Sequence, residues 1–120
     1  MVKVFIVEDE PHIQFLYKQI ISILGFEVVG TASDGEEAIN VYKSFSTEPD
    51  LILMDHRMPK KNGIEATKEI LKISNHTKII FVSADSSIME EVLSLGVVSF
   101  KEKPFTIEKL RRNIEKYVSQ

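Results

Sequence analysis

The chain has 120 residues, a net charge of −3 and 43% hydrophobic residues, which suits one folded domain and is too apolar for a disordered chain. It contains no cysteine, which excludes disulfides, thiolate metal sites and cysteine catalysis. Neither the charge nor any apolar run favours nucleic acid or a membrane as a partner, so we expect one cytoplasmic domain over residues 1–120.

Short apolar runs alternate along the chain with segments in which apolar residues recur every three or four positions. The runs have the composition of buried strands, and the periodic segments are typical of amphipathic helices. In chain order we predict a strand at 4–7, a helix at 11–24, a strand at 28–32, a helix at 38–45, a strand at 51–54, a helix at 64–71, a strand at 78–82, a helix at 88–95, a strand at 97–100 and a helix at 107–118.

The first and last helices carry the clearest apolar faces. Pro11 is placed to open the first helix and Gly25 to end it, and Thr106 is placed to cap the last one. The side chains expected inside are Ile13, Leu16, Tyr17, Ile20, Ile21 and Leu24 in the first helix, and Ile107, Leu110, Ile114 and Val118 in the last.

Five strand–helix units in succession predict an α/β domain with a parallel sheet, right-handed crossovers and helices on both faces. The alternation does not fix the order of the strands. We adopt the order 2-1-3-4-5 from the doubly wound, flavodoxin-like class, in which five strands are flanked by five helices.

The third predicted strand ends in an acid. Residues 51–54 are all apolar and run directly into Asp55, and Glu8 with Asp9 follows the first strand in the same way. In the adopted order these two strand ends are neighbours at the switch point. Three carboxylates at such short separations raise each other's pKa unless a cation lies between them. Oxygen ligands with room for water suit Mg²⁺, and Mn²⁺ can replace it. The competing interpretation is that all three are ordinary turn acids.

Two further polar side chains follow the fourth and fifth strands. Ser83 offers a hydroxyl and Lys103 an ammonium group at the same edge of the sheet. Facing a carboxylate–metal site, they favour a strongly negative ligand, and a phosphoryl group fits. Taken singly, Ser83 could be a helix cap and Lys103 a surface cation. Packing gives no reason for all five side chains to gather at one edge.

As a set, these motifs resemble the response regulator receiver domain of two-component signalling. The residues that carry the resemblance are Glu8-Asp9, Asp55 with Met58-Pro59 and Gly63, Ser83-Ala84, and Lys103-Pro104-Phe105. They occur in order and at family-like spacing over essentially all 120 residues. Each motif alone is weak, but the complete set is highly specific.

The resemblance implies a role for each residue. Asp55 would accept a phosphoryl group, Lys103 would neutralise its oxygens, and Ser83 would donate a hydrogen bond to one of them. Phe100 would be the switch aromatic that turns inward when Ser83 moves. Mg²⁺ would be bound by Asp9, Asp55 and the backbone carbonyl of Arg57, with Glu8 acting through water.

The chain departs from the family pattern modestly. Phe100 replaces a frequent Tyr, and Glu8 stands where Asp is also frequent. Lys101 and Glu102 make the end of the last strand more polar than expected, which puts this edge in doubt as a generic dimer surface.

Two charged residues are expected at the rim of the pocket. Arg57 follows Asp55 by two positions, and Asp85 follows Ser83 by two. They would pair across the phosphoryl group and shield it from water, or they are two unrelated solvated side chains.

We therefore expect a switch that a sensor histidine kinase or phosphotransfer protein phosphorylates, and that catalyses only its own phosphorylation and dephosphorylation. The alternatives are a Mg²⁺-dependent aspartyl-phosphate phosphohydrolase and a pseudo-receiver that is never phosphorylated. A phosphohydrolase of the haloacid-dehalogenase kind would need an acid where Arg57 stands. An FMN-binding domain would need a phosphate loop after the first strand, where Glu8-Asp9-Glu10 would repel the phosphate. The downstream effector, an attached output domain, the cognate kinase and the oligomeric state stay open.

Overall fold

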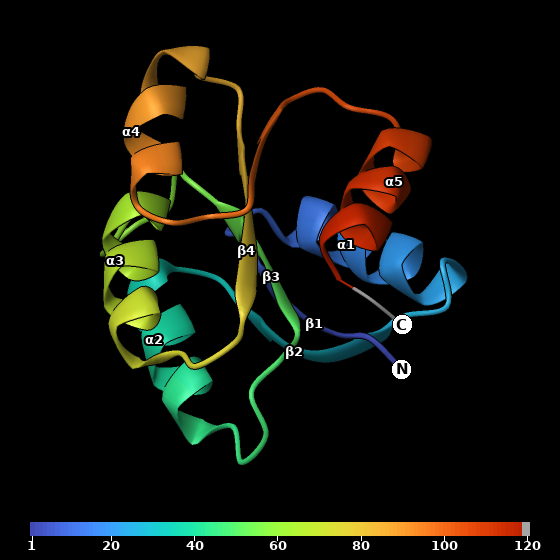
Figure 1. The fold of residues 1–120 in the computed structure, drawn as a ribbon, viewed down its shortest axis with the longest axis horizontal. Coiled ribbons are helices and arrows are strands. Elements are labelled where there is room, and N and C mark those ends of the chain that lie inside the picture. Colours follow the sequence, from blue (N-terminus) through green and yellow to red (C-terminus); the bar gives the residue numbers. More distant parts are fainter. Residues whose placement is uncertain (119–120) are drawn as a thin grey trace.

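The computed structural model describes residues 1–118 and shows a parallel sheet between two layers of helices (Figure 1). In chain order the elements are β1 (Lys3–Val7), α1 (Pro11–Ile23), β2 (Glu27–Ala32), α2 (Gly35–Ser44), β3 (Leu51–Asp55), α3 (Gly63–Ile73), β4 (Lys78–Ser83), a 3₁₀ turn η1 (Ser86–Ile88), α4 (Met89–Ser94), β5 (Ser99–Glu102) and α5 (Ile107–Tyr117). The predicted alternation of strands and helices is confirmed.

The strands lie in the order β2-β1-β3-β4-β5, and every neighbouring pair is parallel. The adopted doubly wound order is therefore confirmed. Val7 at the end of β1 is in register with Met54 near the end of β3. Because both strands end at the same edge, the residues that follow them meet there.

Two apolar cores cover the two faces of the sheet. In Figure 1, α1 and α5 lie on one side of the strands and α2, α3 and α4 on the other. Strand side chains alternate between these layers, so Val4 and Ile6 belong to the first core while Phe5 and Val7 belong to the second. This two-sided burial explains why the central strands read as continuous apolar runs.

The last strand lies two residues later than predicted, at Ser99–Glu102 instead of 97–100. Val97 is apolar because it packs in the core beside α4, and only Ser99 begins the pairing with Ile80 of β4. Since β5 is an edge strand, charged Lys101 and Glu102 are tolerated in it. The apolar run was therefore a misleading guide to the bounds of this strand.

Two helix faces are more open than predicted. Leu16 is 49% exposed and Ile107 is 53% exposed, although both were expected inside. They border a groove between α1 and the start of α5, which Ile13, Tyr17 and Phe105 also line. The regular apolar pattern of these helices therefore continues past the part of each face that is covered.

The helix ends follow the sequence signals. Pro11 occupies the first turn of α1, and Gly25 just past its end has a φ of +87°, a conformation that favours glycine. The Thr106 hydroxyl accepts a hydrogen bond from the Lys109 amide at 3.1 Å, which confirms the predicted cap of α5.

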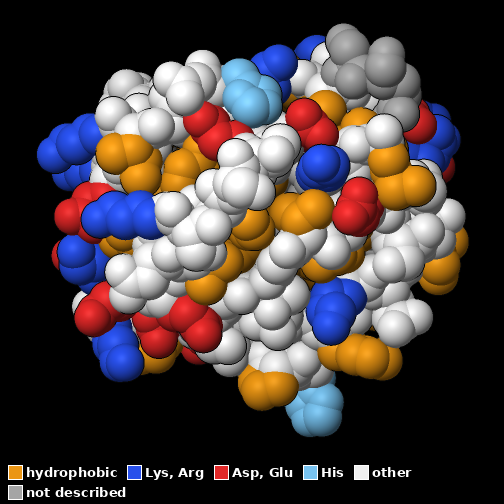
Figure 2. All heavy atoms as spheres, turned by 90° about the horizontal axis from the view of Figure 1, so that it is seen from below, with side chains coloured by type: hydrophobic (Ala, Val, Ile, Leu, Met, Phe, Trp, Pro, Cys, Tyr) orange, Lys and Arg blue, Asp and Glu red, His pale blue; other side chains and the backbone are white. Residues whose placement is uncertain are grey.

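The amino edge of the sheet lies at the bottom of Figure 1, where the loops before β3 and β4 are found. Figure 2 views the molecule from below and shows acidic and basic side chains interspersed with apolar and uncharged groups on that side. Among residues 1–118, no helix combines the length and apolar character needed to cross a membrane.

Candidate functional site

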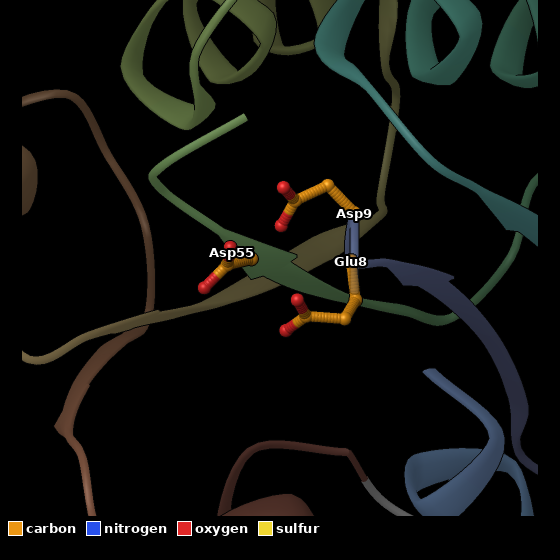
Figure 3. A group of neighbouring side chains, drawn as sticks. All are labelled: Glu8, Asp9 and Asp55. Carbon is orange, nitrogen blue, oxygen red and sulfur yellow. The ribbon is translucent and has the colours of Figure 1, made fainter. Parts of the chain in front are cut away.

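Three carboxylates meet where β1 and β3 end. Glu8, Asp9 and Asp55 each offer an oxygen within 4.8 Å of the others. Figure 3 shows the three side chains near one another and extending to the same side of the view, two from the end of β1 and one from the end of β3. The predicted acidic cluster is therefore present, and for Glu8, which is only 2% exposed, the interpretation as a solvated turn acid is wrong.

Burial and mutual repulsion both act on these acids. Burial raises the pKa of Glu8, and the charge of Asp55 raises it further, while the Glu10 amide and Lys103 compensate only in part. Burial likewise raises the pKa of Asp55, with a further contribution from Asp9, although the Lys103 hydrogen bond lowers it. The net direction is upward for both acids, mainly because burial disfavours their charged forms.

Lys103 is the counter-charge of the cluster. Its Nζ donates a hydrogen bond to Asp55 Oδ1 at 2.8 Å and lies 3.5 Å from Glu8 Oε1. Burial lowers the pKa of Lys103, but the hydrogen bond to Asp55 and the charge of that group raise it above its ordinary value. One ammonium group thus contacts two of the three acids, and it stays protonated.

Two contacts hold the Lys103 loop in place. The Lys103 amide donates to the carbonyl of Ser83 at 2.9 Å, and the ring of Phe105 stacks on Tyr17 of α1 with centroids 6.3 Å apart. The peptide bond between Lys103 and Pro104 is cis. The loop therefore joins β4 to α1, and it carries the ammonium group to Asp55.

Glu8 Oε1 is buried and accepts no hydrogen bond. Its nearest cation is the Lys103 ammonium at 3.5 Å, which is an ion pair without a hydrogen bond, so this oxygen has capacity left for another partner. The candidate metal ligands of the cluster are all carboxylate oxygens, which suit a hard divalent cation such as Mg²⁺. The residues therefore fit a Mg²⁺ site, with the backbone of the β3–α3 loop close at hand.

The β3–α3 loop is anchored tightly behind Asp55. The Gly63 amide donates to the His56 carbonyl at 2.8 Å, and a Cβ at Gly63 would lie 2.3 Å from the Asp55 carbonyl oxygen. Lys60 in this loop has a positive φ of 66°, and the Gly35 amide donates to the Lys61 carbonyl at 3.0 Å. Gly63 is thus required by close packing, and Asp55 has little freedom to shift.

Ser83 and Phe100 lie where the sequence predicts, on β4 and β5. Ser83 is buried, and its hydroxyl accepts a hydrogen bond from the Asp85 amide at 3.0 Å. Phe100 is half-buried and stacks on Phe81, with centroids 6.1 Å apart and ring planes 15° apart. The Ser83 hydroxyl thus forms its hydrogen bond within the β4–α4 loop. The carbonyl of the same residue accepts the hydrogen bond from the Lys103 amide.

The two rim residues do not pair in this structure. Within residues 1–118, Arg57 forms no ion pair, and the Asp85 carboxylate instead accepts from the amide and hydroxyl of Ser87, at 3.0 and 2.5 Å. The Ser87 hydroxyl is the main cause that lowers the pKa of Asp85, and the charge of Arg57 adds to it. The predicted pairing concerns a phosphorylated state, so it stays a prediction.

Sequence reasoning did not find three residues around the site. Gln14 of α1 donates to the carbonyls of Glu8 and Ala32 at 3.0 and 3.1 Å, and so fixes the β1–α1 turn. Burial raises the pKa of Tyr17 to about 12, with Lys103 lowering it and Glu8 and Asp55 raising it. His56 directs its ring onto Phe81. Tyr17 was expected inside the first helix but not at the site, and only His56 had a signal for the site, because it directly follows Asp55.

Comparisons with known proteins agree with this geometry. Residues 4–115 match the family described as response regulator receiver domain. The chain is 41% identical over 105 residues to the chemotaxis protein CheY of Thermotoga maritima, a match that covers 86% of each chain. It is 38% identical to the probable C4-dicarboxylate response regulator DctR of Bacillus subtilis, covering 96% of this chain and 51% of that protein, so it spans about half the length of this relative.

A solved structure gives the same result for the fold. The CheX–CheY–BeF3–Mg²⁺ complex of Borrelia burgdorferi contains a chain that superposes with a TM-score of 0.91 at 29% identity, over 96% of this chain and 87% of that one. That complex is named for the Mg²⁺ and BeF3 that it contains.

Proposed function

The chain belongs to the family of response regulator receiver domains, and from this membership we propose that it is a switch with Asp55 as its phosphoryl acceptor. The observation that carries the proposal is the buried Asp55 carboxylate, which shares a cluster with two other acids and receives a hydrogen bond from Lys103 at 2.8 Å. A carboxylate at a strand end, next to one fixed cation, is suited to attack phosphorus in line.

The donor is a phosphohistidine of a sensor histidine kinase or a phosphotransfer protein. One oxygen of Asp55 forms a bond to phosphorus while the phosphorus–nitrogen bond breaks, and the departing imidazole takes up a proton. Lys103 then moves its hydrogen bond from the carboxylate toward the phosphoryl oxygens, where its charge stabilises the transferring group. The chain thus catalyses its own phosphorylation and later hydrolysis, and it turns over no metabolite.

Mg²⁺ would be held by Asp9, Asp55 and the Arg57 carbonyl, with Glu8 acting through water. When bound, it supplies positive charge against the oxygens of the transferring group. Glu8 Oε1, which accepts no hydrogen bond, and the raised pKa values of Glu8 and Asp55 support this assignment.

Phosphorylation is relayed through Ser83 and Phe100. The Ser83 hydroxyl leaves the Asp85 amide to donate to a phosphoryl oxygen, and Phe100 turns further inward in response. Moving such a two-state element from mostly off to mostly on takes about 5.5 kcal/mol of differential stabilisation. The hydrogen bond to Asp85 is the contact that phosphorylation must replace.

The partners follow from the same proposal. The chain receives its phosphoryl group in the cytoplasm from a kinase or phosphotransfer protein and acts on a separate effector or an attached output domain. The domain over residues 1–120 itself needs neither nucleic acid nor membrane. In basic α5, Arg111 and Arg112 pair with Glu108, so part of its charge is already neutralised.

Acetyl phosphate tests the assignment of Asp55. We expect intact-mass spectrometry to show one added phosphoryl group, only with Mg²⁺ present, and hydroxylamine to remove it. Asp55→Asn should take up none, while Glu36→Gln, which changes an exposed acid in the first turn of α2, should behave as wild type. An equal adduct on Asp55→Asn would disprove the assignment, and no adduct on the wild type would favour a pseudo-receiver.

A further inference from the structure

Asp55 and His56 are consecutive, and their side chains lie on opposite sides of the sheet. Asp55 contacts Lys103, whereas the His56 ring lies against Phe81 with centroids 5.7 Å apart and planes 43° apart. Phe81 belongs to the core that α2, α3 and α4 cover. Strand alternation explains the divergence, since successive residues face opposite layers. His56 therefore leads from the acceptor to the other layer of the domain.

The aromatic contacts continue from Phe81 to β5. Phe81 is completely buried, is in register with Phe100, and stacks on it at 6.1 Å. Three rings thus lie in succession, from the residue beside the acceptor to the proposed switch aromatic. Ring pairs at these separations are in direct packing contact, so a shift of one ring is felt by the next.

The backbone of His56 is held while its side chain is less constrained. The Gly63 amide fixes the His56 carbonyl, and a Cβ at Gly63 would lie 2.8 Å from the His56 Cα, so the loop has no room to move there. In contrast, His56 Nδ1 is buried without a hydrogen-bond partner. No hydrogen bond at that nitrogen locks the ring, so a change beside Asp55 is more easily met by the ring than by the backbone.

We propose that His56 is a positioning residue that couples the state of Asp55 to Phe100 through Phe81, in parallel with Ser83. The inference rests on the proposed function, because it needs a change at Asp55 to transmit. Its physical basis is packing: phosphorylation crowds the end of β3, the His56 ring shifts against Phe81, and the stacked Phe100 moves with it. Ser83 acts on Phe100 separately, through the β4–α4 loop.

The test places 4-fluorophenylalanine at position 100 and records fluorine spectra with and without BeF3⁻ and Mg²⁺. Bound BeF3⁻ gives its own fluorine signals, so occupancy of the acceptor and the response of residue 100 are read in one spectrum. We expect His56→Ala, at saturating BeF3⁻, to lose about half or more of the wild-type shift of residue 100. His56→Phe keeps a ring on Phe81 and should retain most of the shift.

Two further variants complete the design. His56→Ala combined with Ser83→Ala should lose the remaining response, since both routes are then removed. If His56→Ala does not fold, His56→Leu takes its place, because it fills the space without a ring. Wild-type protein with no bound BeF3⁻ signal would contradict the proposed function itself. Bound BeF3⁻ with an undiminished residue-100 shift in His56→Ala, or equal losses in His56→Ala and His56→Phe, would overturn the role of the His56 ring alone.

Discussion

The two edges of the sheet treat partly buried carboxylates in opposite ways. At the amino edge, Glu48 precedes β3 and accepts hydrogen bonds from Tyr42, Asn75 and Thr77, at 2.8 to 3.2 Å. At the carboxyl edge, Glu8 Oε1 accepts none. Burial raises the pKa of both acids, but the Asn75 and Tyr42 hydrogen bonds outweigh it and lower that of Glu48 to about 2, whereas the pKa of Glu8 stays raised.

The contrast separates a fully hydrogen-bonded carboxylate, Glu48, from the carboxylates that we propose as functional. Glu48 joins the loops before β3 and β4 and has its hydrogen-bonding capacity filled, so its charge stabilises the fold. Glu8 and Asp55 are less well compensated, which costs stability and leaves capacity for a cation and a phosphoryl group. Strained or unsatisfied groups persist where a function requires them.

Glu48→Ala is expected to show how much the hydrogen bonds of Glu48 at the amino edge contribute to stability. It leaves the buried Tyr42 and Thr77 hydroxyls and the Asn75 amide with fewer partners, so the free energy of unfolding should fall by about 3 kcal/mol. Urea denaturation followed by circular dichroism measures it. Glu36→Ala, at an exposed position of α2, is the control and should stay within about 0.5 kcal/mol of wild type. A loss as small as that of the control would mean that Glu48 is not a structural carboxylate.

The two edges should also respond to pH in opposite directions. The stability from Glu48 is present above its ordinary pKa of 4.5 and is lost as pH falls through its folded value of about 2. The pKa of Asp55 is raised in the folded state, so ionising it costs stability as pH rises from its ordinary value of 3.8 through the raised one.

Metal-free denaturation between pH 2 and 7 separates the two edges. The deficit of Glu48→Gln relative to wild type should shrink as pH falls toward 2. The advantage of Asp55→Asn should shrink as pH falls through the raised pKa of Asp55 toward its ordinary value of 3.8. Parallel slopes for the two variants would show that the carboxylates do not differ in this way.

The sequence predicted the carboxylate contacts at the carboxyl edge of the sheet better than those at the amino edge, for a physical reason. Glu8, Asp9 and Asp55 directly follow apolar strands, and parallel strands bring their ends together, so local pattern was enough. The groups that donate hydrogen bonds to Glu48 come from α2 and from the loop before β4. No local sequence pattern indicates that these two segments lie beside Glu48.

The predicted bounds of β5 and the predicted burial of Ile107 were wrong for a related reason. Val97 and Ile107 are apolar, but pairing with β4 begins only at Ser99, and α1 does not cover the start of α5. An apolar pattern shows that a residue tends to be buried, not which neighbour buries it.

Substitutions of the rim residues Arg57 and Asp85 are expected to have the smallest effect, and it concerns the rate of autodephosphorylation. Asp85 resembles Glu48 in that its carboxylate accepts hydrogen bonds, from Ser87, yet its amide contacts Ser83 of the proposed site. If Arg57 and Asp85 pair over a phosphoryl group, Arg57→Ala and Asp85→Ala should each speed autodephosphorylation by up to about fivefold, and the double variant should add little. Phosphate release at low and high salt measures it. Fully additive rates, or rates unchanged by either substitution, would mean that the two residues do not act together.

The central claim is that the carboxyl edge carries uncompensated charge that a divalent cation relieves. The most direct test is thermal denaturation at increasing Mg²⁺, starting from EDTA. The wild type should be stabilised by about 2.7 kcal/mol at a hundred times the dissociation constant, and Asp9→Asn combined with Asp55→Asn should start more stable in EDTA and gain almost nothing. A double variant that gains as much as the wild type would contradict the account.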